Sequence, residues 1–135
     1  MGTYNLTHAE LMCRLRACTH DHSEPVAPPP EVLTHYVIVR SDLPAGILAA
    51  NIVHAAGESS PGNLPSGTHA IVLTVPDEPA LRAMRARLEL AQVAHVACEE
   101  PDPPYHGALM SLGLTPGRKE HLRRYVSSLP LLKKM

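Results

Sequence analysis

The sequence contains no phenylalanine and no tryptophan, and four tyrosines supply the only phenol rings. RNA-binding domains that stack bases on rows of aromatic side chains therefore do not fit this composition. No run of about 18 apolar residues occurs, so we expect no membrane span, and residues 1–17 lack the apolar segment of a signal peptide. Three cysteines are too few, and odd in number, for a disulfide framework. These absences together predict a cytoplasmic protein.

The residues that are present suffice for one domain. Hydrophobic side chains make up 44% of the 135 residues, so aliphatic groups must build the core. The net charge of −1 hides an uneven distribution, because residues 41–117 carry three basic and eight acidic side chains whereas residues 118–135 carry six and one. Arg118, Lys119 and Arg123 in this basic end are candidates for holding phosphate groups, and an ordinary solvated helix is the alternative.

Prolines divide the chain into an appendage, residues 1–34, and a domain, residues 35–135. Pro25 and the three prolines at 28–30 form a stiff linker. Before the linker, a capping box from Thr7 to Glu10 predicts a short helix over residues 8–18. The appendage also holds four side chains that could ligate a metal, Cys13, Cys18, His20 and His22. Their spacing does not match a familiar zinc pattern, so we predict no metal site and no cofactor.

Within residues 35–135 the hydrophobic pattern predicts the element order βαβαββα. Strands are expected at 35–40, 69–75, 93–98 and 108–113. Helices are expected at 45–57, closed by Gly57, at 78–90, capped by Asp77, and at 116–128, started by Pro116. Strands that alternate with helices favour parallel neighbours, so we expect an α/β domain with a helix-covered sheet and one antiparallel strand.

Two motifs resemble the type II peptidyl-tRNA hydrolases, in particular the divergent branch of peptidyl-tRNA hydrolase domain-containing proteins. The first runs from a hydrophobic strand through Arg40-Ser41-Asp42-Leu43, and the second is the small-residue helix from Gly46 to Ala56. The junction at Val75 to Glu78 and a Leu-Pro-Leu-Leu ending extend the similarity over about residues 35–133. The resemblance implies a four-stranded mixed sheet between helices, and an activity that hydrolyses the ester joining a peptide to tRNA.

The resemblance also implies a site, from which this chain departs. The family's helix lysine corresponds to Ile47, its glutamine to Asn51, and its histidine to His54. The family's aspartate corresponds to Glu99 or Glu100, which we expect directly after the third strand, and the shortened loop at 101–106 has no threonine. Ile47, Asn51 and His54 are spaced i, i+4, i+7, so they are expected to share one helix face.

Two functional hypotheses follow from this pattern. The first is a peptidyl-tRNA hydrolase in which His54 or a glutamate directs water, Asn51 orients the carbonyl and the basic end holds tRNA phosphates. Loss of a cationic or oxyanion donor lowers rates by roughly 10²–10³, so this activity would be weak. The second is a non-catalytic module on the same fold that binds tRNA or protein. A homodimer is compatible with either hypothesis.

Overall fold

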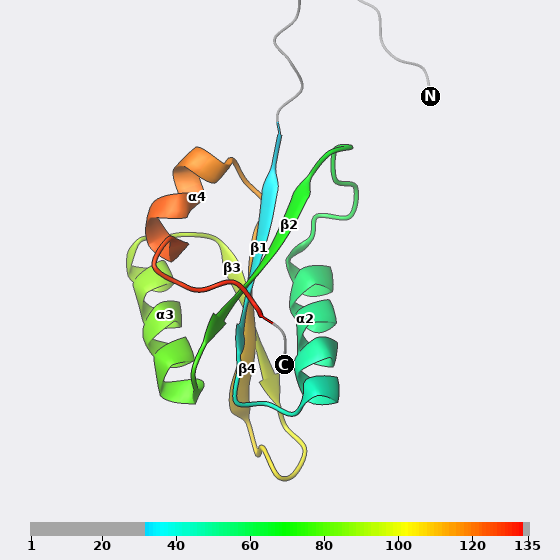
Figure 1. The fold of residues 1–135 in the computed structure, drawn as a ribbon, viewed down its shortest axis with the longest axis vertical. Coiled ribbons are helices and arrows are strands. Elements are labelled where there is room, and N and C mark those ends of the chain that lie inside the picture. Colours follow the sequence, from blue (N-terminus) through cyan, green and yellow to red (C-terminus); the bar gives the residue numbers. More distant parts are fainter. Residues whose placement is uncertain (1–31, 134–135) are drawn as a thin grey trace, which may run out of the picture. The chain divides into compact units, whose positions relative to one another are not determined.

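The computed structural model describes residues 32–133, and the order of its elements confirms the predicted βαβαββα pattern (Figure 1). The strands are β1 (Thr34–Arg40), β2 (His69–Val75), β3 (His95–Glu100) and β4 (Ala108–Leu114). The helices are α2 (Ala45–Ser59), α3 (Glu78–Leu90) and α4 (Lys119–Val126). The predicted appendage helix at 8–18, the proline linker and the Cys13, Cys18, His20 and His22 cluster lie outside the described residues.

The four strands form one mixed sheet in the order β2-β1-β4-β3. β1 pairs with β2 in parallel along its whole length, from Thr34 opposite His69 to Arg40 opposite Val75. β4 runs antiparallel to both of its neighbours, β1 and β3. The prediction of a mixed sheet with a single antiparallel strand is therefore confirmed.

Helices cover both faces of this sheet, α2 on one face and α3 with α4 on the other (Figure 1). The larger core lies on the α3 side, where Leu81, Met84 and Leu88 meet residues of the strands and of α4. The smaller core lies under α2 and includes Leu48 and Met110. Leucine, methionine and other aliphatic side chains supply most of both cores, and Tyr36, 3% exposed, adds a buried aromatic ring to the larger one.

Several predicted boundaries differ from those of the structure by one to three residues, and three of these differences have a clear physical cause. Helix α2 passes through Gly57 and ends at Ser59, whose hydroxyl bonds back to the carbonyl of Ala55. Strand β3 begins at His95 rather than 93, because a turn with positive φ at Gln92 intervenes. Helix α4 begins at Lys119 rather than 116, because Gly117 pairs with Thr34 at the start of β1.

The end of the described chain closes one edge of the sheet. Residues 129–132, called the C-terminal segment below, run antiparallel along β2. The amide of Thr74 donates to the carbonyl of Pro130 at 2.9 Å, and the amide of Leu132 donates to that of Val72 at 3.0 Å. This pairing satisfies backbone groups that an edge strand would otherwise leave exposed.

None of the helices in residues 32–133 has the length and hydrophobicity to cross a membrane.

Candidate functional site

Asn51 is turned into the protein and held there. Its side chain is 7% exposed, and its amide nitrogen donates to the carbonyl of Ile47 one turn earlier, at 2.9 Å. The backbone carbonyl of Asn51 in turn accepts a bond from the hydroxyl of Ser111 on β4, at 3.0 Å. The bond from Ser111 therefore anchors the backbone of α2 to the sheet, whereas the Asn51 side chain bonds within its own helix and does not face a ligand outside it.

The three residues of α2 that were expected to share one helix face differ in their exposure to solvent. At 100° per residue, Ile47, Asn51 and His54 span an arc of about 60°. The buried side of α2, marked by Leu48 and Ala55, lies beyond the Asn51 end of this arc. Asn51 is consequently buried, whereas His54 and Ile47 are exposed. The structure therefore keeps the three residues within one arc of α2, but only Ile47 and His54 face outward.

Glu99 and Glu100 lie within β3, not after it as expected. Glu99 is exposed, and a carboxylate oxygen of Glu100 accepts a bond from the amide of Asp102 at 3.0 Å. In the part of the chain that the structure describes, no hydrogen bond or ion pair joins either glutamate to His54. A water-activating pair of His54 with a glutamate is thus not assembled.

The carboxylate that does link α2 to β3 is Glu58, a residue that no motif in the sequence marks. The thiol of Cys98 donates to an oxygen of Glu58 at 3.3 Å. Burial raises the pKa of Cys98 to about 11, so this thiol stays protonated at neutral pH and is not a nucleophile. A side chain at the last turn of a helix gives no periodicity signal that would have revealed this contact.

The shortened loop between β3 and β4 carries an aromatic side chain in place of catalytic groups. Tyr105 packs against the core under α2, which includes Leu48 and Met110. The resemblance places an aspartate and a threonine in this loop, whereas here apolar contacts hold it against the domain. The loop therefore braces the first half of α2.

The basic side chains predicted to hold phosphate lie across the sheet from α2. Lys119 and Arg123 are exposed and one helical turn apart on α4. Arg118 precedes this helix and lies 3.6 Å from Glu120. Because α4 covers the face opposite α2 (Figure 1), these residues do not form one site with Asn51 and His54.

A network of charges does form at the carboxyl ends of β1 and β2. Arg40 makes a bidentate pair with Asp42, at 2.8 and 2.9 Å, and donates to the carbonyl of Leu109 at 3.2 Å. Glu78 at the start of α3 accepts from the amide of Leu109 at 2.8 Å. The bonded guanidinium lowers the pKa of Asp42, and the amide of Leu109 lowers the pKa of Glu78. The network joins β1, α3 and β4 through Leu109, so Arg40, held by Asp42, links these elements.

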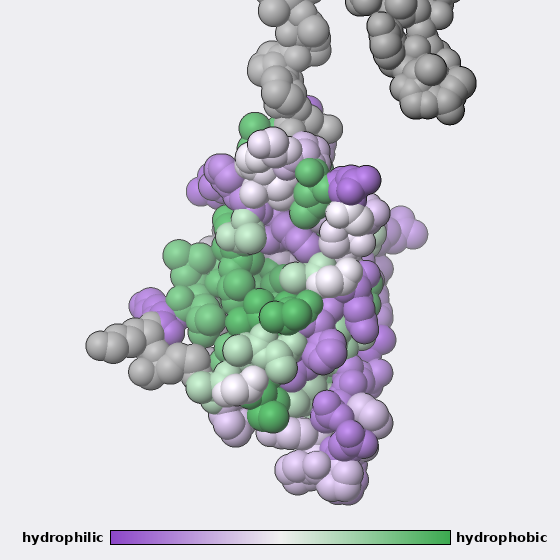
Figure 2. Space-filling model, turned by 90° about the vertical axis from the view of Figure 1, so that its right-hand side faces the viewer, coloured by the Kyte–Doolittle hydropathy of each residue, from purple (hydrophilic) through white to green (hydrophobic). Residues whose placement is uncertain are grey.

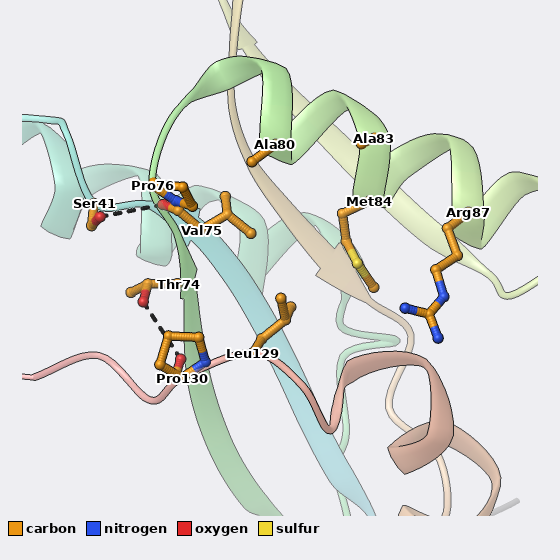
Figure 3. Close-up of a pocket in the computed structure, with 10 residues that line it drawn as sticks. All are labelled: Ser41, Thr74, Val75, Pro76, Ala80, Ala83, Met84, Arg87, Leu129 and Pro130. Atoms are coloured by element: carbon orange, nitrogen blue, oxygen red, sulfur yellow. Dashed lines mark hydrogen bonds between the residues drawn. The ribbon is translucent and has the colours of Figure 1, made fainter.

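Two hollows beside the C-terminal segment have no counterpart in the sequence analysis. A pocket of about 470 Å³ lies between α3 and this segment, with Met84, Val75 and Leu129 among its walls (Figure 3). A second hollow of about 340 Å³ lies between Leu48 of α2 and Leu132. Both depend on pairing between residues distant in sequence, which no local pattern specifies.

The surface above α2 is apolar and almost free of charge. From Ala45 to Gly57 the helix contains no acidic or basic side chain apart from His54. Val53 is 70% exposed and Ile47 is 38% exposed. In Figure 2, which shows this side of the molecule, a continuous hydrophobic area covers the left and centre of the surface, and hydrophilic residues border it on the right. We call the exposed side of α2, with Ile47, Ala49, Ala50 and Val53, the α2 face.

No protein-family model matches the chain, and no curated protein matches it. In residues 32–133, no group of three or more histidine, cysteine, aspartate or glutamate side chains is arranged to hold a metal ion.

Proposed function

We propose that this protein is a non-catalytic binding module on the fold of the type II peptidyl-tRNA hydrolases, and that it contacts a protein partner through the α2 face. One observation carries the proposal. Where the family resemblance puts a catalytic lysine, the helix exposes Ile47 within an uncharged apolar face. Exposed contiguous apolar surface of this kind is typical of interaction sites.

The chemistry of ester hydrolysis supports the same conclusion. Hydrolysis needs a base to activate water and a donor for the developing oxyanion. Asn51 stands where the resemblance puts the family's glutamine, but its side chain is 7% exposed and one of its two N–H donors is bonded to the carbonyl of Ile47. Glu99 and Glu100 have no bond to His54. A base, a donor and a cation are thus not brought together over α2.

Binding through the α2 face gains free energy from the burial of side chains that are now exposed. Complete burial of a valine or isoleucine side chain is worth about 1.5–3 kcal/mol relative to full exposure. Val53 is 70% exposed and has most of this gain available, whereas Ile47 at 38% has less. Val53 should therefore be the more sensitive position in an interface.

The first arm of the test measures chemistry. Purified wild type is incubated with peptidyl-tRNA, and release of the peptide is followed beside a buffer control and the Ile47→Lys variant. We expect wild type to match the buffer control, because no water-activating pair is assembled. Turnover by wild type that is abolished in His54→Ala would overturn the proposal and establish the hydrolase instead.

The second arm measures binding. A photo-crosslinking residue is placed at the exposed Ala50 of α2 and, as a matched control, at the exposed Ala86 of α3. A protein captured at 50 and not at 86 is purified, and its affinity is measured for wild type and for Val53→Asp. We expect Val53→Asp to weaken binding at least about tenfold, which is about 1.4 kcal/mol. Equal affinity for both proteins, or no capture at 50, would contradict the proposal.

Binding to tRNA is the competing non-catalytic function, and Lys119 with Arg123 on α4 is the observation that favours it. Contacts to phosphates release counterions, so such binding falls steeply as salt rises. Binding at low salt that is lost in a Lys119→Gln, Arg123→Gln double variant would establish it.

A further inference from the structure

The pocket beside α3 has the size and lining of a ligand site. Its volume of about 470 Å³ falls within the range of roughly 300–1,000 Å³ found for small-molecule sites. Its walls are mainly apolar and come from Val75, Ala83, Met84 and Leu129. Figure 3 shows Met84 directed from α3 toward the C-terminal segment. An aliphatic group would therefore be buried on three sides.

One cation stands at the end of this pocket. Arg82 and Arg85 on α3 are each paired with a glutamate one turn away, at 2.8 and 3.0 Å. Arg87, by contrast, has no carboxylate partner among residues 32–133, and one of its nitrogens donates to the carbonyl of Arg124 at 3.2 Å. A guanidinium has five N–H donors, so several remain for an anion.

Two hydroxyls stand at the opposite end of the pocket from Arg87 (Figure 3). Ser41 donates to the carbonyl of Val75 at 3.3 Å, and Thr74 donates to that of Pro130 at 3.5 Å. Both bonds are long, and each hydroxyl oxygen keeps acceptor capacity. A ligand that matches this pocket is therefore apolar in the middle and polar at both ends.

We propose that this pocket binds the C-terminal residue of a peptide with an aliphatic side chain. The terminal carboxylate pairs with Arg87, the side chain lies between Met84 and Leu129, and an amide of the preceding residue reaches the hydroxyls of Ser41 and Thr74. A fatty acid has one polar end only, and it leaves the hydroxyl end of the pocket unmatched. The pocket is separate from the α2 face, so the inference does not depend on the proposed function.

The test is an NMR titration of the full-length, ¹⁵N-labelled protein with four probes. These are the tripeptide N-acetyl-Ala-Ala-Leu, its C-terminal amide, N-acetyl-leucine and octanoate. We expect the tripeptide acid to shift amide signals of α3 and of residues 129–132, and to bind at least about 5-fold more tightly than its amide. That factor is what one partly exposed ion pair supplies. We also expect it to bind more tightly than N-acetyl-leucine and octanoate.

Matched variants locate the site. Arg87→Gln should weaken binding of the tripeptide acid about 5-fold, whereas Arg85→Gln, whose arginine is paired with Glu89, should leave it unchanged. Ala83 is exposed and lines the pocket, so Ala83→Phe should fill the space and abolish binding. Ala86→Phe adds the same ring to α3 outside the pocket and serves as its control.

Several results would overturn the inference. They are equal affinity for the acid and the amide, no effect of Arg87→Gln, or signal shifts confined to other regions. Tighter binding of octanoate or of N-acetyl-leucine than of the tripeptide acid would assign the pocket to a small carboxylate and so refute the peptide.

Discussion

Replacement of Gly113 by alanine tests how closely α2 is fitted to the sheet. Gly113 lies in β4, opposite Val37 on one side and Val96 on the other. An added Cβ would collide with the carbonyl oxygen of Ala55 and would lie 2.5 Å from the hydroxyl oxygen of Ser59. The carbonyl belongs to the helix backbone, so relief of the collision requires α2 to move away from the sheet.

The cost of Gly113→Ala has two parts. Overpacking of a close-fitted contact costs about 1–3 kcal/mol. Movement of Ser59 also disturbs its bond with the buried Nε2 of His35, at 2.7 Å, and an unsatisfied buried polar group costs a further ~1–3 kcal/mol. We therefore expect the free energy of unfolding to fall by about 3 kcal/mol. In a domain of this size that lowers Tm by roughly 12 °C or more.

The measurement is urea unfolding followed by circular dichroism, with Gly57→Ala as the matched control. Gly57 lies inside α2 with no atom within 4 Å of an added Cβ, so its replacement should raise stability by about 0.5–1 kcal/mol. The reasoning is refuted if Gly113→Ala lies within about 0.5 kcal/mol of wild type, because β4 and α2 would then have room that the structure does not show.

Two further predictions concern stability and a third concerns self-association. Burial lowers the pKa of His35 below 6.5. The unfolded chain therefore binds more protons than the folded one, and the free energy of unfolding falls as pH drops from 6.5 toward the lowered pKa. When unfolding is measured from pH 7.5 to 5, His35→Gln should show a shallower dependence of this free energy on pH. Arg40→Lys keeps the charge but loses the bidentate bond to Asp42. The free energy of unfolding in urea should therefore fall by about 1–2 kcal/mol. An unchanged urea midpoint would show that this bond does not stabilise the fold. Deletion of residues 129–135 uncovers the edge of β2, so sedimentation velocity should detect self-association that rises with concentration; a stable monomer would show that the edge is protected in another way.

Periodicity and capping in the sequence were enough to specify the elements and their order. Strand β2 was placed at residues 69–75 and α3 at residues 78–90, with the bounds that the structure shows. The cap was correct as well, because Asp77 accepts from the amide of Ala80 at 3.0 Å. Signals that act within one or two turns are local, and the sequence displays them directly.

The candidate site was predicted less well. Helical spacing correctly put Ile47, Asn51 and His54 within one arc, but the boundary between core and solvent divides that arc. Whether Asn51 is buried depends on how α2 packs against β4. The hydroxyl of Ser111 on β4 donates a hydrogen bond to the backbone carbonyl of Asn51 and so fixes this contact. The separation of Lys119 and Arg123 from α2 likewise depends on which face of the sheet each helix covers.

The sequence by itself determined an aliphatic α/β domain with an uncharged second helix, because composition and period are properties of the chain. The tertiary structure alone decided the rest. It turned Asn51 inward, left His54 without a glutamate and closed the edge of β2 with residues 129–132. It also formed the pocket between Met84 and Leu129. Each of these results joins residues far apart in the chain, and only packing brings such residues together.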